Sequence, residues 1–283
     1  MVDRICMVTG ANRGIGRATA QGLANLGATV ILVCRDQIKG DQARNEIIEI
    51  SKNLKIDQVI ADLSRTQQIR KLAVDFSMVY DRLDVLINGA TGIFHKRELS
   101  GDNIEMNFGL NYLPYFTLPN LLIDLLKASS SARVINVSTE SHRDAEINFD
   151  DLFFENDYNP ITAYMQAKLA NILTTYELAH KLTGTHITVN CLDPGVVDTQ
   201  GLAAIRDSVR RIYGGAPSSQ PVPTEEGAKA SLYLATAANV EGVSGKYFVD
   251  MKESESSDNS NNLETAKKLW KLSEEISGVK LNI

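Results

Sequence analysis

The sequence has little basic charge, few cysteines and no long hydrophobic run. Its 29 Lys and Arg residues against 35 Asp and Glu give a net charge of −6, whereas nucleic acids and anionic membranes bind concentrated basic faces. The apolar runs are too short to span a bilayer, and the first residues lack the charged and apolar regions of a signal peptide. We therefore expect no nucleic-acid partner, no membrane span and a cytoplasmic location, with a removed N-terminal anchor as an open alternative.

The three cysteines, Cys6, Cys34 and Cys191, lie far apart in apolar runs that are typical of strands. We expect them to be buried, reduced thiols, which suit a reducing compartment. We expect no metal site in the chain.

Short β-branched runs alternate with longer amphipathic stretches along most of the 283 residues. The expected strands are Ile5–Thr9, Thr29–Cys34, Lys55–Ile60, Val85–Asn88, Arg133–Ser138, Ile187–Leu192 and Lys246–Val249. The expected helices are Ile15–Leu26, Gln37–Ser51, Thr66–Tyr80, Ile104–Lys127, Ala163–Leu182 and Glu225–Ala238. Continuous apolar strands separated by helices are typical of a parallel sheet covered on both faces. The sequence therefore predicts an α/β fold, a doubly wound parallel sheet of about seven strands in a single domain spanning residues 1–283.

Three segments interrupt this pattern. Pro114 and Pro119 fall inside a helical stretch, so that helix should be kinked or begin later than the pattern suggests. The polar run Lys252–Asn262 is expected to be a mobile surface linker to a C-terminal helical extension at about 263–277. The segment at about 200–223 is expected to form a lid over a ligand.

A glycine-rich loop follows the first strand and opens directly into a helix. Glycines let the backbone approach a pyrophosphate, which binds the free amides and the positive dipole end of the helix. Between the first strand and first helix of an alternating chain, this loop indicates a dinucleotide-binding Rossmann fold, with a tight turn and no ligand as the alternative. The candidate ligands in the loop are Gly10, Asn12, Arg13, Gly14, Ile15 and Gly16.

The end of the second strand indicates which dinucleotide binds. An acid there would bind the ribose 2′-hydroxyl of NAD, whereas an arginine meets the 2′-phosphate of NADP. Here the neutral Cys34 stands at the position of the acid, and Arg35 follows it, with Arg13 as a second cation on the same side. We favour NADP(H), although both arginines could be solvated surface charges and Asp36 could weaken a phosphate site.

Tyr164 and Lys168 start a helix four residues apart, which places both side chains on one face. A phenol has an ordinary pKa of about 10, so a nearby ammonium is needed for acid–base work near neutrality. A tyrosine and a lysine at this spacing are common on protein surfaces. The pair indicates a catalytic site only together with the motifs around it.

Together these motifs resemble the short-chain dehydrogenase/reductase family over essentially the whole chain, and within it the retinol-dehydrogenase-type carbonyl reductases. The segments that carry the resemblance are the glycine loop, Asp62–Ser64, Leu86–Asn88, Asn111–Leu113, Arg133–Ser138, Tyr164–Asn171, Pro194–Thr199, Glu241–Phe248 and Lys267–Glu275. The resemblance implies an enzyme that moves hydride between NADP(H) and a carbonyl or alcohol, with Tyr164 as the acid or base.

The resemblance also implies roles for individual residues. Asp62 would contact the adenine and Asn88 the ribose region, while Asn111 would hold a helix kink and a water for proton relay. Lys168 would bind the nicotinamide ribose and lower the pKa of Tyr164, and Thr199 would meet the carboxamide. The remaining implied cofactor contacts are Leu63, Pro194, Gly195 and Val197. Each motif has a plainer alternative, such as a helix cap at Asp62, a core amide at Asn111 and a simple turn at Pro194–Gly195.

The chain departs from the family pattern at two places. The usual Asn-Asn-Ala-Gly appears as Asn88-Gly89-Ala90-Thr91, so cofactor contacts there are altered. The usual catalytic serine aligns with Thr139, next to Ser138. Since consecutive strand residues point to opposite faces, only one of these two hydroxyls should face the substrate, and the spacing to the tyrosine selects Thr139.

The predicted partner is a small-molecule carbonyl or alcohol. Apolar residues of the expected lid favour an apolar ligand, although they could equally pack the lid onto the body; they are Leu202, Ala203, Ile205 and Tyr213. The alternative function is a catalytically weak, dinucleotide-sensing binding protein, which the two departures support. The family resemblance suggests a homodimer or tetramer, or a monomer if the C-terminal helix covers the usual interface.

Overall fold

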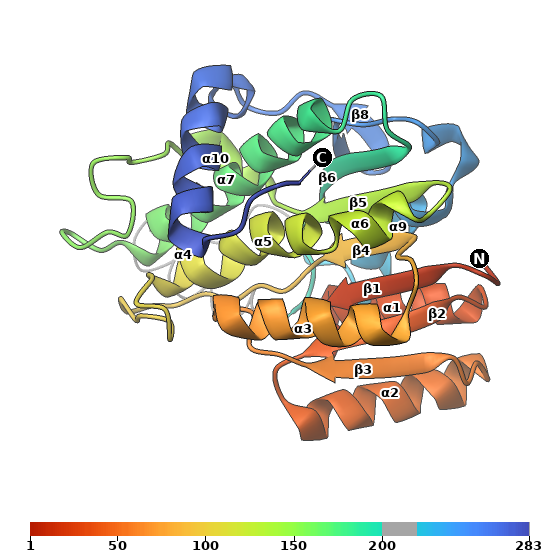
Figure 1. The fold of residues 1–283 in the computed structure, drawn as a ribbon. Helices are drawn as coiled ribbons and strands as arrows, with labels where there is room; N and C mark the ends of the chain where they lie inside the picture. Colours follow the sequence, from red (N-terminus) through yellow and green to blue (C-terminus); the bar gives the residue numbers. More distant parts are fainter. Residues whose placement is uncertain (200–219, 283) are drawn as a thin grey trace.

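The computed structural model describes residues 1–199 and 220–282 and contains one eight-stranded sheet in the order β3-β2-β1-β4-β5-β6-β7-β8 (Figure 1). The strands are β1 (Ile5–Thr9), β2 (Thr29–Cys34), β3 (Ile56–Ile60), β4 (Val85–Asn88), β5 (Ala132–Val137), β6 (Ile187–Asp193), β7 (Tyr247–Val249) and β8 (Lys252–Ser254). All neighbouring pairs are parallel except β7 and β8. The predicted doubly wound parallel sheet is therefore confirmed.

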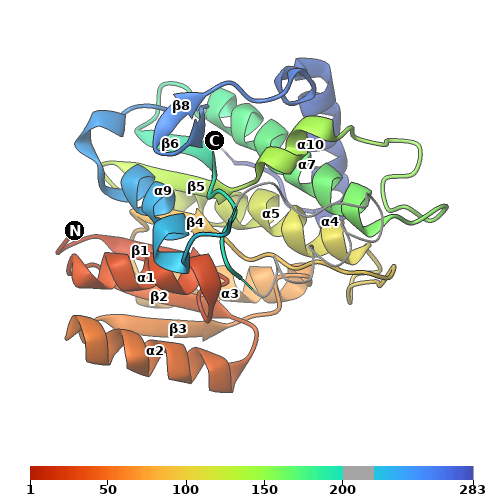
Figure 2. The same ribbon diagram turned by 180° about the vertical axis from the view of Figure 1, so that it is seen from behind.

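Helices cover both faces of the sheet, as Figures 1 and 2 show from opposite sides. One face carries α1 (Gly14–Asn25), α2 (Gln37–Ser51) and α9 (Thr224–Thr236). The other face carries α3 (Thr66–Val79), α5 (Leu113–Leu121), α7 (Pro160–Lys181) and α10 (Leu263–Ser277). The expected C-terminal helix is thus α10, which packs along α7 and α5.

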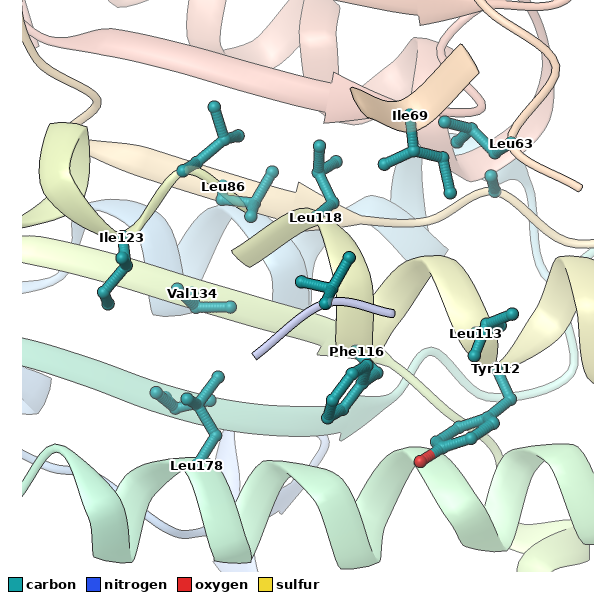
Figure 3. Close-up of a cluster of buried hydrophobic side chains, with 14 of the residues drawn as sticks. Leu63, Ile69, Leu86, Tyr112, Leu113, Phe116, Leu118, Ile123, Val134 and Leu178 are labelled. Carbon is teal, nitrogen blue, oxygen red and sulfur yellow. The ribbon is translucent and has the colours of Figure 1, made fainter. Parts of the chain in front are cut away.

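The inner strands are apolar on both faces, which explains their continuous apolar sequences. In β1, Cys6 and Val8 belong to the core under α1 and α9, whereas Met7 between them belongs to the core under α3 and α5. Figure 3 shows the second core, where Leu86 of β4 and Phe116 of α5 lie among buried aliphatic side chains. This alternation is the two-residue period of a strand that is buried on both sides.

The eighth strand corrects the prediction of a mobile linker at Lys252–Asn262. This run contains β8, which pairs with β7 through the Tyr247–Ser254 register, and the 3-10 helix η3 (Asp258–Asn261). Asp250 and Met251 make the turn with φ values of 48° and 62°. Two consecutive positive φ values are the geometry of a tight hairpin turn, which glycine or asparagine normally signals in a sequence. Without that signal, the polar composition of the run was misleading.

Prolines break the expected helix at residues 104–127 into three. They are α4 (Met106–Asn111), α5 and α6 (Ile123–Lys127). Pro114 lies in the first turn of α5, where its missing N–H leaves no hydrogen bond unmade, and Pro119 lies inside that helix. The predicted interruption is confirmed, and it falls directly after Asn111.

Residues 200–219 of the expected lid, including Leu202, Ala203, Ile205 and Tyr213, lie outside the described residues. The segment returns at Val222, which forms a parallel bridge with Val197. The three cysteines are free and buried. No helix in the described parts of the chain is long and apolar enough to cross a membrane.

Candidate active site

The predicted site residues gather at the carboxyl ends of β1, β4, β5 and β6. The strand order reverses between β1 and β4, because β2 and β3 lie on one side of β1 and the later strands lie on the other. In open parallel sheets, this reversal leaves a crevice at the carboxyl ends of the strands, where ligands bind. The reversal therefore places the expected crevice at the carboxyl ends of β1 and β4, where the glycine loop and the loop after β4 meet.

The glycine loop is shaped by close backbone contacts. Gly10 has a φ of 71°, and a Cβ built on it would lie 2.8 Å from the Cα of Ala90. A Cβ on Gly16 would lie 2.5 Å from the carbonyl oxygen of Gly10. Larger residues at either position would push the loop away from the sheet. The loop is thus held against β4, with Asn12 and Ile15 partly buried and Arg13 exposed just before α1.

This loop fits a bound pyrophosphate. Helix α1 is 12 residues long and begins at Gly14, so its first amides point into the crevice with the positive end of the helix dipole. Gly14 has a φ of 58°, and a Cβ there would lie 3.5 Å from the Thr199 methyl carbon. The loop after β6 therefore lies against the glycine loop at the start of α1.

The end of β2 carries no free carboxylate where an adenosine ribose would lie. Burial raises the pKa of Cys34 to about 11, so this thiol stays neutral. The Asp36 carboxylate accepts a 3.0 Å hydrogen bond from the Lys39 amide and caps α2. Arg35 between them is exposed. This end of the strand therefore presents a cation, with its nearest acid engaged in a helix cap.

Asp62 lies just after β3, and Asn88 is the last residue of β4. The Asp62 carboxylate accepts hydrogen bonds from the Ser64 amide (3.0 Å) and hydroxyl (2.7 Å), while Leu63 is buried in the core. Asn88 donates to the Asn136 side chain at 2.8 Å, and its own buried Oδ1 has no hydrogen-bond partner among the described residues. A buried orphan acceptor beside the crevice is consistent with a ligand contact.

Helix α7 brings Tyr164 and Lys168 together under the end of β5. Lys168 is buried, and its Nζ donates to the Val137 carbonyl at 2.9 Å and lies 5.8 Å from the centroid of the Tyr164 ring. Burial, with no counter-ion among the described residues, lowers the pKa of Lys168 to about 7. Burial also raises the pKa of Tyr164 to about 12, a rise that a hydrogen bond with Thr91 opposes and the Asp193 carboxylate adds to. In this state the phenol is protonated and can act as an acid.

The two neighbouring hydroxyls after β5 point in different directions. The buried Ser138 hydroxyl donates to the Lys168 backbone carbonyl at 3.0 Å. Thr139 is partly exposed and extended, and its Oγ1 accepts from the Ser141 amide at 3.4 Å and the Ser141 hydroxyl at 3.3 Å. The proton of the Thr139 hydroxyl is therefore available to a ligand in the crevice, whereas that of Ser138 is used in packing.

Asn111, the last residue of α4, joins the loop after β4 to α7. Its side chain exchanges two 2.8 Å hydrogen bonds with the Gly92 backbone and accepts from the Thr91 hydroxyl at 3.0 Å. Its backbone carbonyl accepts from the Asn171 side chain at 2.9 Å. The residue that replaces the usual glycine, Thr91, thus contacts both Asn111 and Tyr164.

The loop after β6 completes the site. Gly195 has a φ of 76°, which turns the chain after Pro194, and Val197 is buried against the start of α9. Asp193 ends β6 directly before this turn, and burial raises its pKa to about 6. The sequence prediction did not include Asp193 or Thr91 in the site, although each directly adjoins a predicted residue or motif.

Comparison with known families and proteins agrees with this geometry. The pattern of the family described as short chain dehydrogenase matches residues 4–210. Retinol dehydrogenase 14 of Mus musculus is 39% identical over 99% of the chain and 87% of its own length. Retinol dehydrogenase 12 of Homo sapiens is 40% identical over 98% of the chain and 87% of its own length. Human polyprenol dehydrogenase is 39% identical over 98% and 86%.

Solved structures share the same fold. A Mycobacterium paratuberculosis protein superposes with a TM-score of 0.82 and 28% identity, over 100% of this chain and 96% of its own. The active-site complex of Pseudomonas aeruginosa RhlG with NADP superposes with a TM-score of 0.71 and 25% identity, over 92% and 97%. The fold, the site and these similarities therefore point to one family.

Proposed function

The chain belongs to the short-chain dehydrogenase family, and from that premise we propose that it is an NADP(H)-dependent oxidoreductase that interconverts an apolar carbonyl compound and its alcohol. The observation that carries this proposal is that α7 holds Tyr164 and Lys168 together at the end of β5, where Lys168 binds the Val137 carbonyl two residues before Thr139. A hydroxyl donor, a phenol and an ammonium at one place are the groups that carbonyl reduction requires.

A dinucleotide held at the glycine loop would supply or accept the hydride. Tyr164 donates its proton to the substrate oxygen in reduction and removes it in oxidation. The Thr139 hydroxyl donates a hydrogen bond to the same oxygen while negative charge develops on it. The Lys168 ammonium stabilises the Tyr164 phenolate that remains, and Asn111 holds the loop after β4 against α7 so that these groups keep their distances.

The end of β2 supports NADP(H) over NAD(H). Arg35 is exposed beside a neutral Cys34, and Arg13 is exposed directly before α1. Two cations and no unpaired acid favour a 2′-phosphate, because each charge-assisted hydrogen bond to a phosphate is strong. A relative of the fold, RhlG, has been crystallised with NADP.

The proposed substrate is an apolar aldehyde, ketone or alcohol. The relatives at 38–40% identity are named retinol and polyprenol dehydrogenases, after long apolar alcohols. We also propose a reducing compartment such as the cytoplasm, which the three buried free thiols support.

The deciding experiment follows NADPH binding by fluorescence and NADPH consumption with a panel of retinoid, aliphatic and aromatic aldehydes, diketones and quinones. We expect binding and turnover with at least one apolar carbonyl, and loss of turnover in Tyr164→Phe. Binding without turnover on every member of the panel would favour a dinucleotide sensor instead.

A further inference from the structure

One fully buried imidazole joins the end of β5 to the C-terminal segment of the chain. His142 has no exposed surface. Its Nδ1 lies 2.7 Å from the carbonyl oxygen of Thr139, and its Nε2 accepts a 3.1 Å hydrogen bond from the Ser257 amide. Thr139 is three residues before His142 in the sequence, whereas Ser257 is 115 residues after it. The imidazole therefore joins Thr139, whose hydroxyl is proposed to bind the substrate oxygen, to the C-terminal segment at Ser257.

The two partners fix the protonation state of the ring. A backbone amide can only donate, so Nε2 must be unprotonated, and a backbone carbonyl can only accept, so Nδ1 must carry the proton. Only the neutral Nδ1–H tautomer makes both bonds. Burial lowers the pKa of His142, which keeps this tautomer at neutral pH.

Other contacts hold the same two segments together. The 3-10 helix η1 (Glu140–Asp144) follows Thr139, and its Arg143 donates to the Glu255 carbonyl at 2.7 Å. The Tyr247 hydroxyl donates to Glu140 at 2.6 Å, and the Tyr247 ring packs edge-on against His142 with centroids 5.2 Å apart. The histidine is thus the buried centre of a frame built from η1, β7 and the C-terminal segment.

We propose that His142 is a positioning residue: through its two hydrogen bonds, the segment at Ser257 fixes the backbone of Thr139 and so aims the Thr139 hydroxyl at the substrate oxygen. This rests on the role proposed for Thr139. Oxyanion stabilisation depends on donors that are already in place, and a small displacement of a reacting or stabilising group is costly to the rate. The segment expected to be a mobile linker is thereby part of the machinery that orients the active site.

A matched pair of substitutions at Ser257 tests this link. Ser257 has a φ of −68°, the value that proline adopts, so Ser257→Pro removes the N–H that binds His142 and puts a ring carbon in its place, which displaces the imidazole. Ser257→Ala keeps that N–H and removes only the hydroxyl, which accepts from the Ser260 amide at 3.3 Å. We expect kcat to fall roughly 10-fold in Ser257→Pro, with the Kd for NADPH and the kcat of Ser257→Ala close to wild type. Equal kcat values in all three proteins would overturn the proposal.

Repeating the pair in a Thr139→Val background separates positioning from general destabilisation. If the histidine acts through the Thr139 hydroxyl, Ser257→Pro should cost nothing further once that hydroxyl is gone. An undiminished 10-fold loss in that background would also overturn the proposal. If Thr139→Val alone leaves turnover unchanged, the proposed role of Thr139 fails, which is a separate result.

His142→Asn gives a second route if Ser257→Pro does not fold. Its amide can still donate to the Thr139 carbonyl at the position of Nδ1, but it is too short to reach Ser257. The groups that face His142 are Glu140, Arg143 and Asp144 from η1 and Tyr247 from β7. Because the His142 pKa is lowered on folding, its bond to Ser257 is present at neutral pH and is lost as pH falls through that pKa. The ratio of wild-type to His142→Asn kcat should therefore be roughly 10 at neutral pH and approach one in acid; a ratio independent of pH would contradict the bridge.

Discussion

The Lys168 ammonium lies 5.8 Å from the centroid of the Tyr164 ring, one helical turn away on α7, and it is anchored to the Val137 carbonyl. This anchor fixes the charge beneath the end of β5, where Ser138 and Thr139 follow. The phenol, the ammonium and the Thr139 hydroxyl are thus set by α7 and the end of β5, which hydrogen bonds from Ser138 and Lys168 join. Changes at each group should accordingly have separable effects.

Removing the phenolic hydroxyl should abolish proton transfer and spare binding. Tyr164→Phe keeps the ring, so the NADPH Kd should stay within about twofold while turnover falls roughly 10²-fold or more, the scale of general acid–base catalysis. Fluorescence titration and steady-state kinetics measure the two effects. Retained turnover in this variant would contradict the assignment of Tyr164.

Coenzyme binding should take up a proton at Lys168. Its pKa is about 7 without ligand, so at pH 8 most of the free protein carries a neutral amine. Coenzyme phosphates and ribose hydroxyls favour the ammonium, so binding should take up nearly one proton at pH 8. At pH 6 the amine is already protonated, so binding should take up almost none. The affinity for the coenzyme should therefore weaken as pH rises above about 7. Calorimetry in two buffers with different ionisation enthalpies measures this uptake. Lys168→Met should eliminate it; equal uptake in that variant would place the proton elsewhere.

The arginines near β2 should set the coenzyme preference. The NADPH Kd should be at least about 10-fold below the NADH Kd, which corresponds to about 1.4 kcal/mol from a charge-assisted phosphate contact. Arg35→Ala should remove most of this difference, and Arg13→Ala a further part. Lys39→Ala, on the same exposed helix start, is the matched control and should change little. Equal affinities for the two coenzymes in the unmodified protein would refute the preference.

The order of strands and helices was readable from the sequence because the inner strands are buried on both faces and the helices on one. The hairpin β7–β8 was not, because Asp250 and Met251 adopt positive φ without a glycine to signal it. The glycine loop, Tyr164 and Lys168 were found because their chemistry needs a local spacing. His142 was missed because its partner Ser257 is 115 residues away, and no local pattern encodes a contact of that kind.

The two hydroxyls after β5 should differ in what they affect. Thr139→Val keeps the shape of the side chain and removes the proposed oxyanion donor, which typically costs about 2.7–4 kcal/mol, or roughly 10²–10³-fold in kcat. Ser138→Ala removes the bond to the Lys168 carbonyl, so it should lower the melting temperature more than it lowers kcat. Thr139→Ser should stay active and could accept bulkier ketones. The reverse outcome, with Ser138→Ala inactive and Thr139→Val unaffected, would exchange the two roles.

Thr91, which stands where the family pattern has glycine, should tune the pKa of Tyr164. Its hydroxyl donates to Asn111 Oδ1 at 3.0 Å, and its hydrogen bond to the Tyr164 phenol opposes the rise in that pKa caused by burial. When the phenol ionises, the Thr91 hydroxyl can turn its one proton from Asn111 to the phenolate and stabilise the charged form, so Thr91→Val should raise the pH at which alcohol oxidation becomes fast. Thr91 is exposed, which limits this rise to no more than about one pH unit. The control Thr91→Ser keeps the hydroxyl and should match wild type, whereas Thr91→Gly should follow Thr91→Val. If the pH profiles of kcat/KM for all four proteins coincide, the Thr91 hydroxyl does not act on Tyr164, and its bond to Asn111 serves only to hold the loop after β4.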